Sequence, residues 1–125
     1  MGIHPNVGYD VFPVQGERLG EKAEVIRDGQ TVTGQIVRDD LIDPLVTMIE
    51  LEDGSVVLSD EQDGYIKVEQ GNHKDRPTKV CFNYDTSHIL EGTVVRDDME
   101  EPFRTVIKLD VGRFVLSSEC MYSPR

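Results

Sequence analysis

Short runs in which apolar and polar residues alternate recur along the chain, and none continues with the 3.6-residue period of a helix. In the first half this pattern predicts strands at 23–28, 31–38, 46–52, 55–58 and 64–69, and a short helical turn at 59–62. Asp28-Gly29 and Asp53-Gly54 are tight-turn signals between consecutive strands. The pattern therefore predicts an all-β protein with little helix.

The same plan occurs twice in the chain. Residues 34–61 and residues 92–119 align without a gap and share 14 of 28 residues, whereas unrelated segments would share about one or two. The second copy predicts strands at 79–84, 89–96, 103–110 and 113–116, and a turn at 117–120. Its first hairpin loop, 85–88, is expected to be one residue longer. An internal duplication explains both halves.

Five short strands, with a tight turn before the fourth and a one-turn helix before the fifth, resemble a small SH3-like barrel. The short first hairpin makes the resemblance closer to the Tudor type, over residues 18–70 and 76–122, without a family motif. We therefore predict two tandem five-stranded SH3-like (Tudor-type) barrels at 18–70 and 78–125, with a linker at 71–77. The leader, 1–17, lies outside the repeat and holds a candidate edge strand at 9–14, which leaves a homo-oligomer open.

The chain has 125 residues and a net charge of −11, which opposes binding to a nucleic-acid backbone and favours a basic partner. No apolar run approaches the roughly 20 residues that cross a bilayer, and the N-terminus lacks a secretory signal. We expect a cytoplasmic protein that does not contact the membrane. Cys81 and Cys120 form no CxxC pair, so two buried thiols are expected and a bridge between them stays open.

Arg-Asp-Asp occurs at 38–40 and again at 96–98, each time followed by an acidic residue and a proline. In one interpretation the aspartates cap backbone N–H groups and the arginine pairs locally. In another the loops are acidic contact surfaces for a partner protein. A calcium loop is disfavoured because its alternating ligands and central glycine are missing. The contact surface would comprise Asp39, Asp40, Asp43, Asp97 and Asp98.

Catalytic chemistry finds little support in the sequence. Val-Leu-Ser-x-Glu occurs at 57–61 and 115–119, but a serine nucleophile needs an orienting base. The three histidines, His4, His73 and His88, lie in the leader, the linker and a hairpin loop. No phosphate loop, HExxH or GxSxG motif is present. We predict a non-enzymatic protein without a metal or cofactor.

The two copies differ in charge and in aromatic content. Residues 18–70 hold 5 Lys/Arg and 13 Asp/Glu, a net charge of −8, whereas residues 76–125 hold 7 and 8, a net charge of −1. Tyr84, Phe103 and Phe114 are found only in the second copy, and Arg104 follows Phe103. In Tudor-like barrels, the rim between the first hairpin and the turn from the third to the fourth strand holds aromatic side chains that form a cage around a cationic or methylated group. The alternative is that these aromatic residues pack in the core.

The leading functional prediction is a protein-interaction module that binds a partner protein through the acidic loops and the second-copy residues Tyr84, Phe103, Arg104 and Phe114. Three alternatives stay open. The first is an acidic decoy that occupies a nucleic-acid-binding protein, as viral regulators do. The second is a weak nucleic-acid-binding module, and the third is a small-ligand binder or an enzyme.

Overall fold

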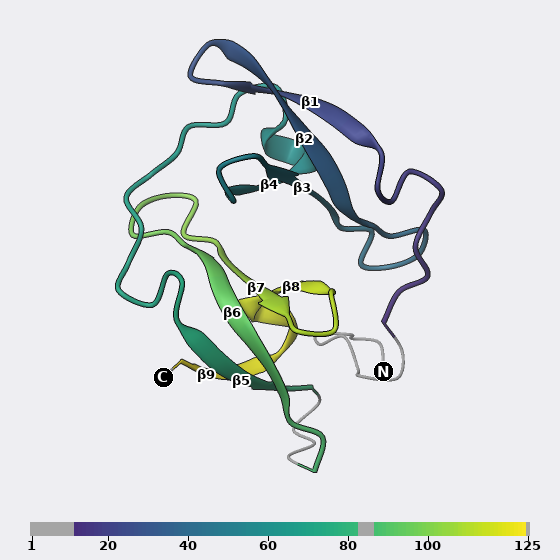
Figure 1. The fold of residues 1–125 in the computed structure, drawn as a ribbon, viewed down its shortest axis with the longest axis vertical. Coiled ribbons are helices and arrows are strands. Elements are labelled where there is room, and N and C mark those ends of the chain that lie inside the picture. The colour runs from purple at the N-terminus through teal and green to yellow at the C-terminus, as the bar shows by residue number, and fades with distance from the viewer. Residues whose placement is uncertain (1–11, 83–86, 125) are drawn as a thin grey trace. The chain divides into compact units, whose positions relative to one another are not determined.

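The computed structural model describes residues 12–82 and 87–124, and it is all-β with two antiparallel sheets (Figure 1). The chain divides into two compact units. The first unit is Pro13–Val68, and the second is Glu69–Arg125 together with the N-terminal residues up to Phe12. Within the described ranges, no helix is long and apolar enough to cross a membrane.

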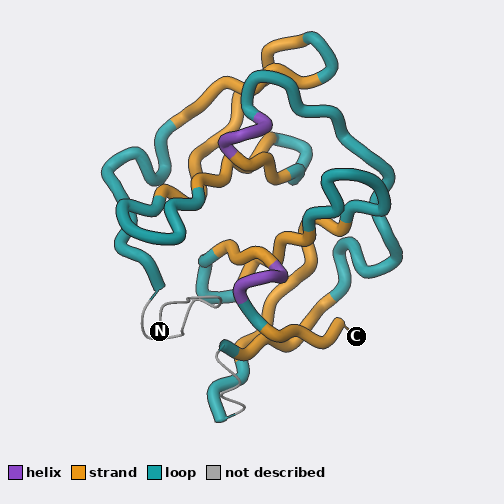
Figure 2. Tube along the Cα trace, turned by 180° about the vertical axis from the view of Figure 1, so that it is seen from behind, coloured by secondary structure: helices purple, strands orange, loops and turns teal. Residues whose placement is uncertain are grey.

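The sheet of the first unit contains four strands in the order β1-β2-β3-β4. The 3-10 helix η2 follows β4, and Figure 2 shows it in purple. The turns between strands place Gly29 at φ +79° and Gly54 at φ +88°, which glycine adopts without steric cost. The bounds are β1 Lys22–Arg27, β2 Gln30–Asp39, β3 Thr47–Leu51, β4 Val56–Leu58 and η2 Ser59–Glu61.

The sheet of the second unit contains five strands in the order β8-β7-β6-β5-β9. After the 3-10 helix η3, the chain returns so that β9 pairs antiparallel with β5. This pairing covers an edge of β5 that would otherwise be open. The bounds are β5 Pro77–Cys81, β6 Leu90–Asp97, β7 Thr105–Leu109, β8 Phe114–Leu116, η3 Ser117–Glu119 and β9 Met121–Pro124.

Two expectations about local structure are corrected. The strand expected at 64–69 does not form, because Gln62 and Tyr65 bond to Ile26 and only an isolated parallel bridge joins Arg27 to Tyr65. The first unit therefore has four strands instead of five. The first hairpin loop of the second unit is three residues longer than that of the first unit, whereas one residue was expected. Val25 pairs with Val32 in the first unit, and the equivalent Val80 pairs with Leu90 in the second.

Each unit has its own hydrophobic core, formed by the inward positions of its alternating strands. Gly34 and Gly92 occupy equivalent sites, where a Cβ atom would lie 2.7 Å from the carbonyl oxygen of Glu50 or Lys108. Glycine is thus required where neighbouring backbones approach closely. The first core contains Val25, Ile36, Ile49, Leu51, Val57 and Tyr65, and the second contains Val80, Phe82, Val94, Ile107, Leu109, Val115 and Cys120.

Phe12 belongs to the second unit although it precedes the first in sequence. Its side chain is half-buried against the second core, and the guanidinium of Arg113 lies 4.7 Å from its ring centroid. Both apolar packing and a cation–π contact therefore hold this residue. The leader was expected to supply an edge strand at 9–14, of which residues 9–11 lie outside the described residues. Among its described residues, only Gln15 makes a β-bridge, to Asp40.

Candidate functional site

Two equivalent segments, which we call the Arg–Asp loops, include the last two residues of β2 and of β6 and the loop after each strand, at residues 38–46 and 96–104. Just before each loop the strand register shifts, between Ile36 and Arg38 and between Val94 and Arg96. Such a bulge re-aims the side chains that follow it. As a result both arginines point inward, and their side chains are 0% and 2% exposed.

A buried ion pair anchors each Arg–Asp loop. Arg38 donates from Nε and Nη2 to the two carboxylate oxygens of Asp40, each at 3.1 Å. Arg96 donates to Asp98 in the same forked geometry at 3.0 Å. Because two parallel hydrogen bonds satisfy a planar guanidinium and a carboxylate together, this geometry suits a desolvated pair. The pair therefore fixes the direction in which each loop leaves its strand.

Each buried aspartate also holds the far side of its loop. Asp40 Oδ2 accepts the N–H of Val46 at 2.9 Å, and Asp98 Oδ2 accepts the N–H of Arg104 at 3.0 Å. Burial by itself raises the pKa of the Asp98 carboxyl, but hydrogen bonds from Arg96, Gln70 and the Arg104 N–H outweigh it and lower the pKa. Both aspartates thus cap the backbone, as one of the two sequence interpretations expected.

A glutamine completes each network, and neither glutamine was predicted from the sequence. Gln15 donates from Nε2 to Asp40 at 2.7 Å and accepts the N–H of Asp39 at 2.7 Å. Gln70 makes the same two hydrogen bonds to Asp98 and Asp97 in the second unit. The repeated Gln-Gly pair at 15–16 and 70–71 was the available signal. Gln15 lay in the segment interpreted as the leader, and Gln70 is the last residue of the first predicted barrel, next to the linker.

The tip of each Arg–Asp loop exposes apolar side chains. Leu45 has φ +60° and is 59% exposed, and Phe103 has φ +55° and is 63% exposed. Each follows a cis-proline peptide bond, at Asp43-Pro44 and Glu101-Pro102. Bulky residues rarely adopt positive φ, and such strain gathers at functional positions. The exposed apolar residues of the tips are Leu41, Ile42 and Leu45 in the first loop and Met99 and Phe103 in the second.

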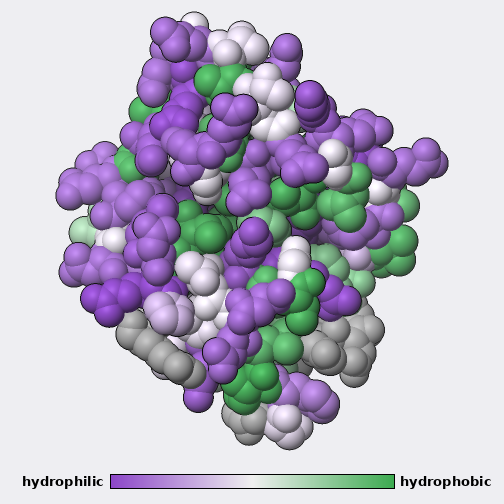
Figure 3. All heavy atoms as spheres, in the orientation of Figure 1, coloured by the Kyte–Doolittle hydropathy of each residue, from purple (hydrophilic) through white to green (hydrophobic). Residues whose placement is uncertain are grey.

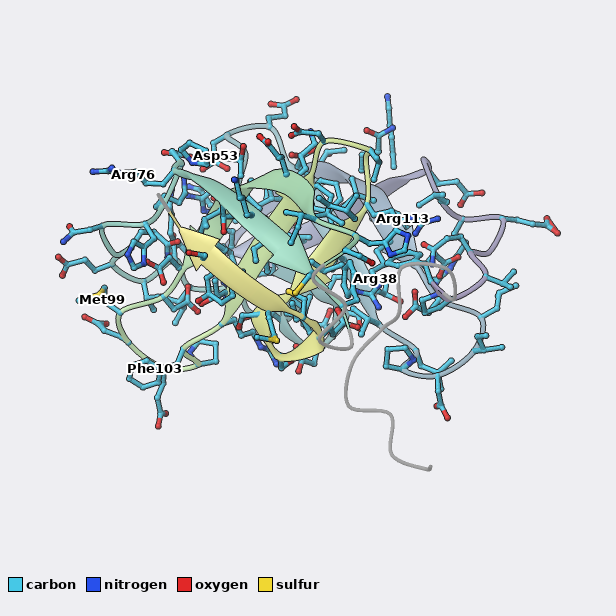
Figure 4. The ribbon with its side chains drawn as sticks, turned by 90° about the horizontal axis from the view of Figure 1, so that it is seen from below. Arg38, Asp53, Arg76, Met99, Phe103 and Arg113 are labelled. Atoms are coloured by element: carbon cyan, nitrogen blue, oxygen red, sulfur yellow. The ribbon has the colours of Figure 1, made fainter. Side chains whose placement is uncertain are left out.

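Figure 4 shows how the tip of the second loop meets the solvent. In Figure 4 the side chains of Met99 and Phe103 project outward from their loop, whereas Arg38 lies inside the molecule. Figure 3 shows hydrophobic residues that reach the surface in patches among predominantly hydrophilic ones. Carboxylates at Asp43, Glu100 and Glu101 are exposed beside the apolar tips. Each tip therefore consists of exposed apolar side chains next to exposed carboxylates.

The predicted contact residues separate into accessible and buried groups. Asp43 and Phe103 are exposed, and Asp97 and Arg104 are half-buried. The side chains of Asp40 and Asp98 are completely buried, and that of Asp39 is 5% exposed and bound by Arg18 at 2.7 Å. These three carboxylates are engaged internally and offer little surface to a partner.

The predicted aromatic cage is not assembled by the described residues. Phe114 is buried, with the ammonium of Lys108 at 5.5 Å from its ring centroid. Phe103 projects from the Arg–Asp loop instead. Tyr84 lies outside the described residues. Phe114 therefore occupies an internal position, as the core-packing alternative expected.

Other reactive groups do not converge in the described parts of the chain. His73 and His88 are exposed, and the ring nitrogen Nδ1 of His88 lies 3.2 Å from Ser87 Oγ. Over residues 12–82 and 87–124, no group of three or more His, Cys, Asp or Glu could hold a metal ion. Cys81 and Cys120 are free and buried. Burial, assisted by Glu119 and Cys81, raises the pKa of the Cys120 thiol to about 12.

Comparisons of this chain with protein-family models, with curated proteins and with solved structures found no match.

Proposed function

We propose that this chain is a non-enzymatic protein-interaction module built from two duplicated SH3-like barrels of the Tudor type. The 14 identities in 28 aligned positions support the duplication. Matching registers support it further: Gly34 faces Leu51 in one sheet, and Gly92 faces Leu109 in the other. In this proposal the Arg–Asp loops present the apolar tips to a partner protein.

One observation carries the proposal: both loops hold a bulky apolar residue exposed to solvent at positive φ. Such a backbone conformation costs on the order of 1 kcal/mol for a residue other than glycine or asparagine. A side chain that is mostly exposed recovers little of that cost within its own unit. Leu45 and Phe103 gain further stabilisation if another surface covers them, as expected for an anchor residue at an interface.

The surroundings of the tips indicate the chemistry of the partner. Asp43 borders the first tip, and Glu100 and Glu101 border the second. The first unit, residues 13–68, holds 5 Lys/Arg and 13 Asp/Glu, a net charge of −8. We therefore propose a partner surface with an apolar pocket and a basic rim, because complementary charge speeds association and selects the partner.

The proposal is tested by replacing Phe103 with Asn in the full chain, and by a matched Val111→Asn control. Asparagine tolerates positive φ, so the fold should be retained while the apolar anchor is lost. Val111 is 62% exposed against 63% for Phe103, and it lies in the β7–β8 turn of the same unit. The partner is captured from a lysate with the wild-type chain, and its affinity for each variant is then measured.

We expect Phe103→Asn to weaken partner binding by about 30-fold, as the loss of an interface hot spot does. Val111→Asn should bind like the wild type. Equal affinity of all three chains for the captured partner would reject the tip as the contact surface. Leu45→Asn extends the test to the first unit, where the same loss is expected if both tips are used.

The charge of the first unit favours a second candidate function, an acidic decoy for a nucleic-acid-binding protein. Its net charge of −8 would occupy a site that normally binds phosphate groups. This function requires that a DNA or RNA oligonucleotide compete with the chain for the captured partner. It also requires affinity that falls steeply with salt concentration. Binding without competition would exclude the decoy and leave the interaction module in place.

A further inference from the structure

The outer edge of β1 is open where the equivalent edge of β5 is paired. In the second unit, β9 lies along β5 with Ser123 opposite Lys79. The matching registers of β1 with β2 and of β5 with β6 place Glu24 in the position of Lys79. Among the described residues, no strand pairs with β1 on this side. The second unit thus shows what this kind of edge accepts: an antiparallel strand.

Unpaired backbone groups are concentrated in the first half of β1. Ile26 donates its N–H to the Gln62 carbonyl at 2.8 Å, and the Glu24 carbonyl accepts Gln62 Nε2 at 2.8 Å. Backbone groups alternate along a strand, so the N–H groups of Lys22 and Glu24 point to the same outer edge. Within the described ranges, these two N–H groups and the Lys22 carbonyl have no hydrogen-bond partner.

The edge is also accessible to another chain. Both Lys22 and Glu24 are exposed. An exposed edge with free N–H and C=O groups is a template for pairing with a further strand.

We propose that β1 pairs with β1 of a second copy of this chain, antiparallel and about a twofold axis at Ala23. In this register Glu24 lies opposite the second copy's Lys22, and Lys22 lies opposite the second copy's Glu24. Both residues direct their backbone groups outward, so each Glu24 N–H donates to a Lys22 carbonyl across the axis and each Lys22 N–H donates to a Glu24 carbonyl. The Glu24 carbonyl uses its second lone pair for this bond, because its first accepts Gln62 Nε2. The two β1 strands then join the four-stranded sheets of two first units into one continuous sheet.

Charge complementarity selects a second copy as the occupant. When two copies of Lys22-Ala23-Glu24 run antiparallel about Ala23, each lysine lies opposite a glutamate of the other copy. Residues directly opposite each other share one face of a sheet, so each Lys–Glu pair brings opposite charges together. An isologous twofold contact forms both pairs from a single stretch of sequence. The rest of the first unit is strongly acidic, and this short stretch is neutral.

The test is sedimentation equilibrium of the full chain over about 10 μM to 1 mM, in about 0.15 M salt to screen the net charge. Lys22→Glu and Glu24→Lys each create two like-charge pairs across the axis, and the double variant restores two opposite-charge pairs. Lys79→Glu is the matched control, since Lys79 is exposed at the equivalent position of a strand that β9 already covers. Circular dichroism checks that each variant is folded.

We expect a concentration-dependent dimer that each single reversal weakens at least tenfold. The double variant should return to within about threefold of the wild type, and Lys79→Glu should not differ from it. A wild-type chain that stays monomeric throughout, or a double variant as weak as the singles, would overturn the proposal. The Phe103→Asn variant should dimerise normally, which separates this contact from the proposed partner-binding tips.

A cysteine at the axis provides a second measurement. Ala23 uses its own N–H and carbonyl toward β2, so opposite the second copy's Ala23 it forms a non-hydrogen-bonded pair. The Cα atoms of such a pair are about 4.5 Å apart, within the range that a disulfide spans. Ala23→Cys should therefore give an oxidised dimer on a non-reducing gel, whereas the wild type, whose cysteines are buried, should not. No cross-link at dimer-forming concentrations would refute this register.

Discussion

Replacement of Asp98 by Asn removes the negative charge that faces Arg96 and leaves the size of the side chain unchanged. The two side chains are 0% and 2% exposed, so the guanidinium left behind cannot be solvated. Removal of one member of a buried ion pair costs about 3–5 kcal/mol of the free energy of unfolding. Asn keeps one carbonyl oxygen that can accept the Arg104 N–H, so we expect the free energy of unfolding to fall by about 3 kcal/mol.

The assay is urea unfolding combined with native-state hydrogen exchange. Exchange of the β6 and β7 amides follows the second unit by itself, which is necessary because two compact units need not unfold together. Asp110→Asn is the matched control, since Asp110 is exposed in the β7–β8 turn, and it should change stability by less than about 0.5 kcal/mol. Asp40→Asn should destabilise the first unit by a similar amount to Asp98→Asn in the second.

A double replacement separates the ion pair from general damage to the loop. Arg96→Met with Asp98→Leu removes both charges and fills the space with apolar atoms, so it should be less destabilising than Asp98→Asn. If Asp98→Asn costs no more than Asp110→Asn, the inferred role of the buried pair is refuted.

Three further predictions concern the same structure. Because the pKa of Asp98 is lowered in the folded chain, its contribution to stability is present above the unfolded-state pKa of about 3.9 and is lost as pH falls through the folded-state pKa. Urea unfolding midpoints measured between pH 6 and pH 2 should therefore fall less steeply below pH 4 for Asp98→Asn than for the wild type. Gly92→Ala should cost at least about 2 kcal/mol because its Cβ would meet a backbone oxygen at 2.7 Å, whereas Gly64→Ala, with nothing within 4 Å, should be neutral or slightly stabilising in thermal unfolding. The raised pKa of Cys120, about 12, predicts negligible alkylation by iodoacetamide at pH 8 in the folded chain and rapid alkylation in urea, and labelling at the same rate in both would contradict its burial.

The candidate site was only partly accessible from the sequence. The Arg-Asp-Asp repeat and the prolines marked the two loops, because their spacing recurs 58 residues apart. Which aspartate pairs with the buried arginine could not be predicted from the sequence, since Asp39 and Asp40 are chemically identical, adjacent and both buried. The bulge between Ile36 and Arg38 decides it by turning Arg38 inward toward Asp40. The positive φ and the exposure of Phe103 likewise could not be predicted from the sequence.

The sequence alone determined that the chain is all-β, because alternation and Asp-Gly turns are local signals that each strand carries within itself. It also revealed the repeat and excluded a recognisable catalytic motif. Only the tertiary structure decided that residues 64–69 form no strand on the outer edge of β1, whereas β9 covers the equivalent edge of β5. Strand pairing depends on hydrogen bonds between distant segments. Here the Ile26 N–H donates to the Gln62 carbonyl, and the Ile26 carbonyl accepts the N–H of Tyr65. Alternation within a strand records which face is buried, but it carries no information about which neighbour the edge will meet.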